Sequence, residues 1–383
     1  MKFLLIYVPN LRFPSFSHDW KIYTFDDIAS YKKGPFGSAL KKDLFVPKSK
    51  ESVKVYEQQN AINKDCHLER YFISANYYEK MKSFTVYPGD TIVSCAGTIG
   101  ELYTLPENAD IGIINQALMI IRNNQAIILK DFLNIQFSRM IDEFSKTYSN
   151  GSAIKNIPPF SDLKRKKTYV PDKLEQEKII KFISLLDQKI TTQIKIIDSY
   201  FSLSKAISNT LIGQSKGNTR LRECLNCYSS NTMESVIKQE DLGDYPVYGA
   251  NGIIKKINNY EIEYPSIAIV KDGSGVGKMF KLSGKYSILS TLNYLTSKPG
   301  YDIDYIYYAL KQKSLKKYVV GSGIPHIYFK DYEQEKIYIP QNELKQQNIT
   351  SVLQSIDEEI GNEIKQLKNY ELLKKYLLKN MFV

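Results

Sequence analysis

The longest periodic patterns of apolar residues in this chain occupy two segments, one near the middle and one at the C-terminal end. In residues 174–213 the apolar positions step by 4, 3, 4, 4 and 3 residues, and residues 343–380 repeat these steps. Such a narrow stripe is typical of a coiled-coil seam rather than of a helix lying on a sheet. The predicted seam positions are Ile179, Ile183, Leu186, Ile190, Ile194 and Ile197 in the first segment and Ile349, Leu353, Ile356, Ile360, Ile364 and Leu367 in the second.

The two segments are expected to be long helices that pack on each other. At 1.5 Å per residue each would extend about 60 Å, and a single helix cannot bury such a stripe alone. Because the linker at residues 215–218 is short, the helices should pair antiparallel, with the two globular parts at opposite ends and related by a pseudo-twofold axis. The alternative is that each helix packs only on its own domain.

The helical segments belong to a longer internal repeat. The six seam positions of the first segment lie 170 residues before those of the second. Upstream, a Tyr-Pro pair followed by a β-rich run and a glycine-rich turn occurs twice, at residues 87–100 and 264–277. Residues 151–157 and 321–327 share the pattern Gly-Ser-x-Ile-x-x-Ile. The chain is therefore read as two diverged copies of one unit.

The globular part of each copy mixes strand and helix signals, which indicates an α+β fold. β-Rich runs at residues 91–94 and 267–270 end in glycine turns. We expect Asp131 to cap a helix to Phe144, and Asp304 to cap a helix to about Tyr318. The expected domains are a first globular domain at 1–170, a long helix with a hinge at 171–217, a second globular domain at 218–340 and a C-terminal long helix at 341–383.

The charge balance indicates an anionic partner. Lys and Arg number 52 against 41 acidic residues, which gives a net charge of +11. A basic surface favours nucleic acid first and an anionic membrane second, and solubility alone is the alternative explanation. No apolar stretch approaches the length of a membrane span, and four cysteines are few enough for a reducing compartment. We therefore expect a cytoplasmic protein with a nucleic-acid partner and no membrane partner.

Candidate catalytic and metal motifs fail on their spacing. Residues 272–278 approximate a phosphate-binding loop, but Asp272 stands where its first glycine is needed and Met279 replaces the Ser/Thr that binds magnesium. A turn between strands is the expected structure there. Cys224 and Cys227 have zinc-knuckle spacing without a second Cys/His pair nearby, so two half-buried thiols are expected. We expect the chain to perform no chemistry and to bind no metal or cofactor.

Candidate DNA contacts gather in the glycine turns and in one basic run before the first long helix. Lysines and backbone amides suit phosphates, and Asn251 could make a two-pronged contact with adenine. For each residue taken singly, a solvated surface turn is the alternative. The candidates are Lys32, Lys33, Lys41, Lys42, Thr98, Lys164 and Arg165 in the first copy and Tyr248, Asn251, Lys255, Lys271, Ser274 and Lys278 in the second.

Three motifs together resemble the specificity subunits of type I restriction–modification systems. The first is the opening Pro-Asn-Leu-Arg-Phe-Pro at 9–14, which is followed by Asp-Trp-Lys at 19–21. The second is the run Tyr-Pro-Val-Tyr-Gly-Ala-Asn-Gly-Ile-Ile at 245–254. The third joins Val-Pro at 170–171 to Glu-Gln-x-x-Ile at 175–179, and in the second copy it has diverged to Pro340 followed by Lys-Gln-x-x-Ile at 345–349. The resemblance covers nearly the whole chain.

This resemblance implies a non-catalytic, DNA-binding role. Each globular domain would be a target-recognition domain for one half of a bipartite, asymmetric site in double-stranded DNA, and the helices would set the spacing and dock two modification subunits. Those partners would bring S-adenosylmethionine and methylate adenine, and restriction subunits would use ATP and Mg²⁺. The alternative left open is a coiled-coil scaffold without sequence-specific DNA readout. A single-chain restriction–methylation enzyme would need a fused catalytic domain, for which 383 residues leave no room.

Overall fold

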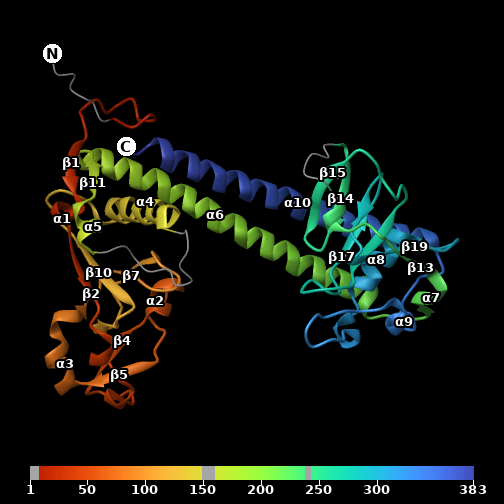
Figure 1. Cartoon of the computed structure of the whole chain (residues 1–383), viewed down its shortest axis with the longest axis horizontal. Coiled ribbons are helices and arrows are strands. Elements are labelled where there is room, and N and C mark those ends of the chain that lie inside the picture. The colour runs from red at the N-terminus through yellow and green to blue at the C-terminus, as the bar shows by residue number, and fades with distance from the viewer. Residues whose placement is uncertain (1–7, 149–159, 238–242) are drawn as a thin grey trace. The chain divides into compact units, whose positions relative to one another are not determined.

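The computed structural model describes residues 8–148, 160–237 and 243–383, which divide into two compact units. Unit 1 comprises residues 1–191 and 369–383, and unit 2 comprises residues 192–368. Each unit contains a globular domain together with one end of helix α6 (Lys173–Ser208) and the opposite end of helix α10 (Glu343–Asn380) (Figure 1). Both long helices were predicted within a residue at their N-terminal ends. A π-helical turn, Asn209–Gly213, continues α6.

Unit 1 is built on three sheets. The antiparallel pair β1 (Lys21–Thr24) and β11 (Lys167–Val170) joins the N-terminal segment to the start of α6. A four-stranded antiparallel sheet has the order β2–β10–β7–β8, with bounds Ala29–Lys33, Leu118–Asn123, Thr91–Ser94 and Leu102–Thr104. A five-stranded mixed sheet has the order β3–β5–β4–β9–β6, with bounds Phe45–Val46, Tyr71–Ser74, Ser52–Tyr56, Gly112–Ile114 and Thr85–Val86.

Unit 2 repeats the first two of these sheets. The pair β12 (Thr219–Arg220) and β20 (Lys336–Ile337) precedes α10 as β1 and β11 precede α6. The four-stranded sheet β13–β19–β16–β17 has bounds Leu225–Ser229, Leu292–Ser297, Ser266–Val270 and Met279–Leu282. Its strands follow one another in the chain and in the sheet as β2, β10, β7 and β8 do. The third sheet differs, because within the described residues of unit 2 it consists of β15–β14–β18, with bounds Gly252–Ile257, Tyr245–Gly249 and Ser287–Ile288.

The equivalence of the two copies extends to single hydrogen bonds. The glycine turn between β7 and β8 closes through the Gly100 amide, which donates to the Ser94 carbonyl at 2.8 Å, and the turn between β16 and β17 closes through Gly277 and Val270 at the same distance. Both glycines have φ values above +80°, which residues with a Cβ rarely adopt. The predicted duplication and the predicted turn at residues 272–278 are therefore confirmed.

Shorter helices connect the strands in both units. They are α1 (Phe25–Ile28), α2 (Gln58–Ile62), α3 (Ala75–Met81), α4 (Lys130–Tyr148) and α5 (Phe160–Arg165) in unit 1 and α7 (Leu221–Cys224), α8 (Ile303–Lys311) and α9 (Phe329–Tyr332) in unit 2. The prediction that Asp304 caps a helix to Tyr318 is wrong. The side chain of Asp302 is the cap, and α8 ends at Lys311. Asp304 instead accepts a hydrogen bond from Gln354 at 2.9 Å. The predicted repeat at residues 151–157 lies outside the described residues.

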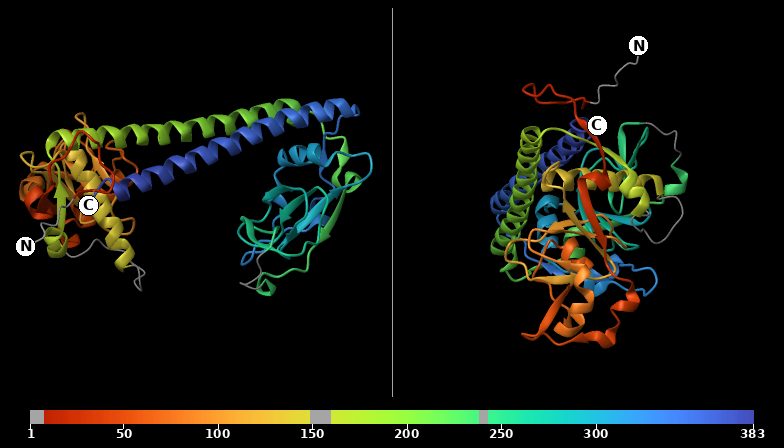
Figure 2. Two further views of the ribbon diagram at one scale, coloured as in Figure 1. Left: turned by 90° about the horizontal axis from the view of Figure 1, so that it is seen from above. Right: turned by 90° about the vertical axis from the view of Figure 1, so that its left-hand side faces the viewer.

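Each unit has a core in which α6 and α10 meet. In unit 1, Ile179, Ile183 and Leu186 of α6 pack with Leu377 of α10 beneath α4. In unit 2, Ile349 and Leu353 of α10 pack with Ile207 and Ile212 near the end of α6 (Figure 2). The start of one helix thus meets the end of the other in both units, so the predicted antiparallel pairing is confirmed.

Two predicted seam positions are wrong. Ile194 is 44% exposed and Ile364 is 46% exposed, whereas the neighbouring Gln193 is buried and Glu363 is half-buried. A seam that stays on one side of a coiled coil needs steps that alternate between 3 and 4. The steps from Ile190 to position 193 and on to Ile197 satisfy this rule. Two successive steps of 4, from Leu186 through Ile190 to Ile194, place the Ile194 side chain away from the face that meets α10. The remaining predicted seam positions are buried or half-buried, namely Ile179, Ile183, Leu186, Ile190, Ile197, Ile349, Leu353, Ile356, Ile360 and Leu367.

Candidate nucleic-acid interface

In unit 2, three loops far apart in the sequence come together at one edge of the domain. The turn between β14 and β15 meets the turn between β16 and β17 where the Lys278 ammonium donates to Asn251 Oδ1 at 3.1 Å. The same glycine turn contacts a third loop, since the Gly273 amide donates to the Pro325 carbonyl at 2.9 Å. Bridge pairing between Asp272 and His326 adds to this contact. We call these segments, residues 249–252, 271–278 and 320–328, the loop cluster of unit 2.

The loop cluster presents groups that suit nucleic acid. Asn251, Ser274 and Lys278 are exposed, so these two turns present an amide, a hydroxyl and an ammonium group, of which the amide and the ammonium group contact each other. The third loop adds the half-exposed ring of Tyr328, which lies 5.1 Å from the His326 ring. Ammonium and hydroxyl groups bind phosphates, amides bind base edges, and aromatic rings stack on bases.

The structure places the remaining predicted residues of unit 2 around this cluster. Lys271 is half-buried at the base of its turn, and its backbone is bonded to Thr291 and Ile327. Tyr248 packs edge-on against the buried Tyr286, with ring centroids 6.0 Å apart, so its ring belongs mainly to the core. Lys255 lies half-buried on β15. Asn251, Ser274 and Lys278 are thus the predicted residues that the fold brings together.

The predicted residues of unit 1 are spread over separate elements. Lys32 and Lys33 lie on β2, with the Lys32 ammonium 4.6 Å from the centre of the Phe84 ring. Lys41 and Lys42 are exposed beside a 3₁₀ turn, and Thr98 is exposed in the glycine turn after β7. The α5 residues are partly engaged, because Lys164 pairs with Asp26 at 2.8 Å and Arg165 Nε donates to the Ser161 carbonyl at 3.2 Å.

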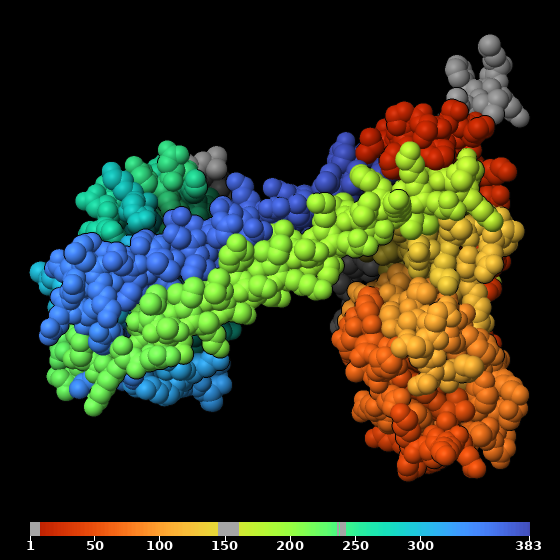
Figure 3. Space-filling view, turned by 180° about the vertical axis from the view of Figure 1, so that it is seen from behind, coloured from red at the N-terminus to blue at the C-terminus, as the bar shows by residue number. Residues whose placement is uncertain are grey.

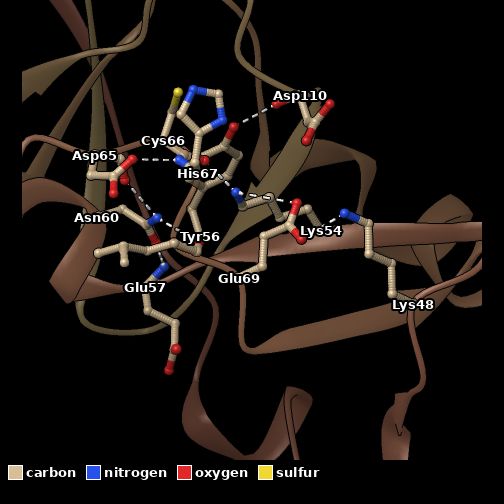
Figure 4. A network of polar contacts seen from close by, with 11 residues as sticks. Lys48, Lys54, Tyr56, Glu57, Asn60, Asp65, Cys66, His67, Glu69 and Asp110 are labelled. Atoms are coloured by element: carbon tan, nitrogen blue, oxygen red, sulfur yellow. Dashed lines mark hydrogen bonds and ion pairs between the residues drawn. The ribbon is translucent and has the colours of Figure 1, made fainter.

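A loop beside α2 that is held by several polar contacts was not predicted. The loop of residues 63–70 is held from beneath by the buried Lys54, whose ammonium donates to the Cys66 carbonyl and lies 4.0 Å from Glu69 (Figure 4). The Asn60 amide donates to the carbonyls of Asp65 and Leu68 at 3.0 and 2.9 Å. Burial lowers the pKa of Lys54, and the Glu69 carboxylate opposes this shift.

This loop is also tied to the glycine turn of unit 1. Lys64 pairs with Glu101 at 2.8 Å and donates to the Leu102 carbonyl at 2.7 Å. His67, Leu68 and Arg70 remain exposed at its tip. Nothing in the local sequence marks the loop, because its anchors are single polar residues whose partners only the tertiary fold brings near.

The junction between the first domain and α6 contains a buried ion pair. The Glu175 carboxylate receives hydrogen bonds from Arg12 Nε and Nη2, both at 2.7 Å, and from Trp20 Nε1 at 3.2 Å. The hydrogen bond with Glu175 raises the pKa of Arg12. Gln176 clamps the strand that precedes the helix, because its Nε2 donates to the Pro171 carbonyl at 2.9 Å. Gln346 repeats this bond with Pro340 at 2.7 Å in unit 2.

The cysteines do not form a metal site within the described residues, where no group of three or more His, Cys, Asp or Glu side chains has the arrangement that could hold a metal ion. Burial raises the pKa of Cys95 and of Cys224 to about 12 and that of Cys227 to about 11. Among the described helices, none is both long and apolar enough to cross a membrane.

The family model for the type I restriction modification DNA specificity domain matches the chain twice, at residues 17–198 and 219–369. The chain belongs to this family. The two matches coincide with the two copies seen in the topology, each comprising a globular domain and most of the long helix that follows it. The family predicted from the sequence motifs is therefore confirmed.

Individual relatives agree with this assignment. The specificity subunit of the type I restriction enzyme MjaVIII from Methanocaldococcus jannaschii is 34% identical over 169 residues, which cover 40% of this chain and only 39% of that protein. The S subunit of the type I system from M. genitalium has a similar fold, with a TM-score of 0.62 at 19% identity over 98% of this chain and 99% of that one. A chain from a structural study of type I complex assembly gives a TM-score of 0.57 at 12% identity, covering 94% and 97%.

Proposed function

We propose that this chain is the DNA-recognition subunit of a type I restriction–modification complex. Each globular domain would bind one half of a bipartite, asymmetric site in double-stranded DNA. The observation that carries the proposal is that the two units share two sheets but differ in the third. The two sheets nearest the long helices recur in both units, whereas among the described residues the third sheet has five strands in unit 1 and three in unit 2.

The long helices are proposed to set the spacing between half-sites and to dock two modification subunits. Beyond the seam, both helices carry exposed apolar side chains in each unit, and a face of the helix pair is visible in Figure 3. Exposed apolar side chains on long helices are what a docking partner could cover. In unit 2 they are Ile194, Ile196, Phe201 and Leu203 on α6 and Leu344, Val352 and Ile364 on α10. In unit 1 they are Leu174, Phe182 and Leu185 on α6 and Leu372, Leu373 and Tyr376 on α10.

The chemistry is proposed to reside on the partners. The modification subunits would bind S-adenosylmethionine and methylate adenine, and the restriction subunits would use ATP and Mg²⁺ to translocate and cut DNA. This chain would contribute recognition and geometry, in the cytoplasm where the DNA is found.

Methylation mapping tests the proposal directly. The chain is expressed with its modification subunits in a host without other methylases, and modified adenines are located across the genome. The expected result is one bipartite motif, and replacing residues 218–340 with another recognition domain should change only one half of it. A change in both halves would contradict modular recognition. The scaffold alternative predicts no motif and no binding to random duplex, whereas a DNA-binding subunit should bind it with affinity that falls steeply with salt.

A further inference from the structure

One polar contact interrupts the apolar seam between α6 and α10. Gln193 is only 4% exposed and lies between Ile190 and Ile197 in the seam. Its Nε2 donates to the Glu363 backbone carbonyl at 3.1 Å and also to the Glu363 carboxylate. Both residues lie in unit 2. A buried amide and a carboxylate in an apolar seam must satisfy each other, because an unpaired partner would lose its solvation without compensation.

The two residues occupy equivalent positions in the two copies. They lie 170 residues apart, which is the offset that relates the seam of α6 to the seam of α10. When two equivalent helices pair antiparallel, a position meets its own counterpart at only one level of the seam. Gln193 and Glu363 mark that level, and there the two copies differ, with a donor on one helix and an acceptor on the other.

Slipped pairings would break this contact. A shift of α10 by one heptad in one direction would place Gln193 opposite Ile356 and Glu363 opposite Leu186, since these lie seven residues before each partner. A shift in the other direction would place Gln193 opposite Tyr370 and Glu363 opposite Tyr200. The apolar seam residues alone would tolerate either shift, because a heptad repeat is nearly the same after seven residues.

We propose that the Gln193–Glu363 pair fixes the register of α6 against α10. A single polar contact in an apolar seam specifies register because a slipped alignment separates its members, and the slip toward Ile356 and Leu186 would leave both of them opposite apolar side chains. Taken with the proposed function, the pair thereby fixes the distance between the two half-sites. The pair also excludes pairing of α10 with α10 of a second copy of this chain at this level, since two Glu363 carboxylates would face each other.

A charge exchange tests whether the two residues act on each other. Gln193→Glu should lower the Tm of the full chain by roughly 3 to 8 °C, because two carboxylates then meet where residue 193 is buried and residue 363 is half-buried. The exchanged double variant, Gln193→Glu with Glu363→Gln, should regain part of this loss, because it restores the hydrogen bond between the two side chains but not the one to the backbone carbonyl of residue 363. Gln188→Glu, on the exposed face of α6, is the matched control and should leave Tm nearly unchanged. A double variant as unstable as the sum of the single changes would overturn the pairing.

A distance measurement tests register itself. Spin labels at Ser202→Cys and Lys365→Cys, both exposed in unit 2, report the alignment of the helices in a chain with Cys227→Ser, since the other three thiols are buried. The chain with the native pair should give one narrow distance. Gln193→Leu with Glu363→Leu should keep or raise Tm yet add a second distance, displaced by about 10 Å along the helix axis for a heptad slip. A single unchanged distance in the leucine variant would overturn the role in register.

These measurements need neither DNA nor partner subunits, so they are independent of the proposed function. In the complete system, the leucine variant should methylate sites with more than one spacer length. Failure to find any methylated motif with the unaltered chain would refute the proposed function and leave the register result standing. A spacer that stays single despite two measured registers would refute only the link between the seam and half-site distance.

Discussion

Replacing Arg12 should destabilise unit 1 more than replacing any surface lysine, because Arg12 neutralises a buried carboxylate. The Glu175 side chain is 1% exposed and that of Arg12 is 13% exposed. Arg12→Met would remove two of the three side-chain donors to this carboxylate and leave only the Trp20 indole. Removing one partner of a buried ion pair costs about 3–5 kcal/mol, since the remaining charge stays desolvated without compensation.

Urea unfolding of the full chain, followed by the fluorescence of Trp20, measures this loss, because Trp20 is the single tryptophan and contacts the same carboxylate. Lys82→Met is the control, since its ion pair with Glu79 is exposed on both sides and should contribute about 0–1 kcal/mol. Adding Glu175→Gln to Arg12→Met should recover part of the stability by removing the stranded charge. An Arg12→Met chain within about 0.5 kcal/mol of the original would refute the claim that the pair is buried and essential.

Three further predictions follow from the seam, the loop cluster and the thiols. In denaturant titrations, Ile183→Asp or Leu353→Asp should lower the free energy of unfolding by more than about 3 kcal/mol. Ile194→Asp should lower it much less, and equal losses would contradict the corrected seam. Lys278→Met should weaken binding to duplex DNA and reduce the slope of log affinity against log salt concentration by about 1. Asn251→Ala should reduce the base preference at one position of a single half-site. The exposed Lys345→Met should change neither property. Because burial raises the pKa of Cys95 and Cys224 to about 12, both thiols should resist a thiol reagent at pH 8 until urea unfolds the chain. The free energy of unfolding should also fall as pH rises from about 9 toward 12. Rapid labelling of Cys95 or Cys224 in a folded Cys227→Ser chain would contradict this.

The long helices were the most predictable part of the fold, because a heptad pattern reports directly on which face is buried. The error at Ile194 and Ile364 has a definite cause. The prediction took the most apolar residue in each helical turn as the seam position. At positions 193 and 363 the seam residue is polar instead. Only the contact between Gln193 and Glu363 makes a polar side chain acceptable there, and a contact across two helices cannot be read from either helix alone.

The candidate DNA-binding residues were predictable as types but not as a site. Asn251 and Lys278 were selected because they lie in glycine turns, and the fold brings them within 3.1 Å. The third loop, which contains His326 and Tyr328, joins them through backbone contacts with the turn at residues 272–278. Backbone contacts of this kind leave no mark in side-chain composition, so this loop was not selected. In unit 1 the predicted lysines lie on separate elements, and the loop held by Lys54 was not predicted.

The motif that joins each domain to its long helix differs between the copies because its residues have different partners in the two units. Gln176 and Gln346 both clamp the strand before their helix, and both copies keep this glutamine. Glu175 in unit 1 anchors Arg12 and Trp20, which belong to the segment before the first strand pair, whereas the position before Gln346 is the exposed Lys345. Unit 2 follows directly from the end of α6 instead, so it has no counterpart of the segment that carries Arg12 and Trp20. A residue that joins a domain to its helix has the same partner in both copies, so its identity is constrained in both. A residue whose partner occurs in one copy only can be replaced in the other. In the same way, the unlike third sheets can diverge without disturbing the two sheets that both units share, as the proposed recognition of two different half-sites would require.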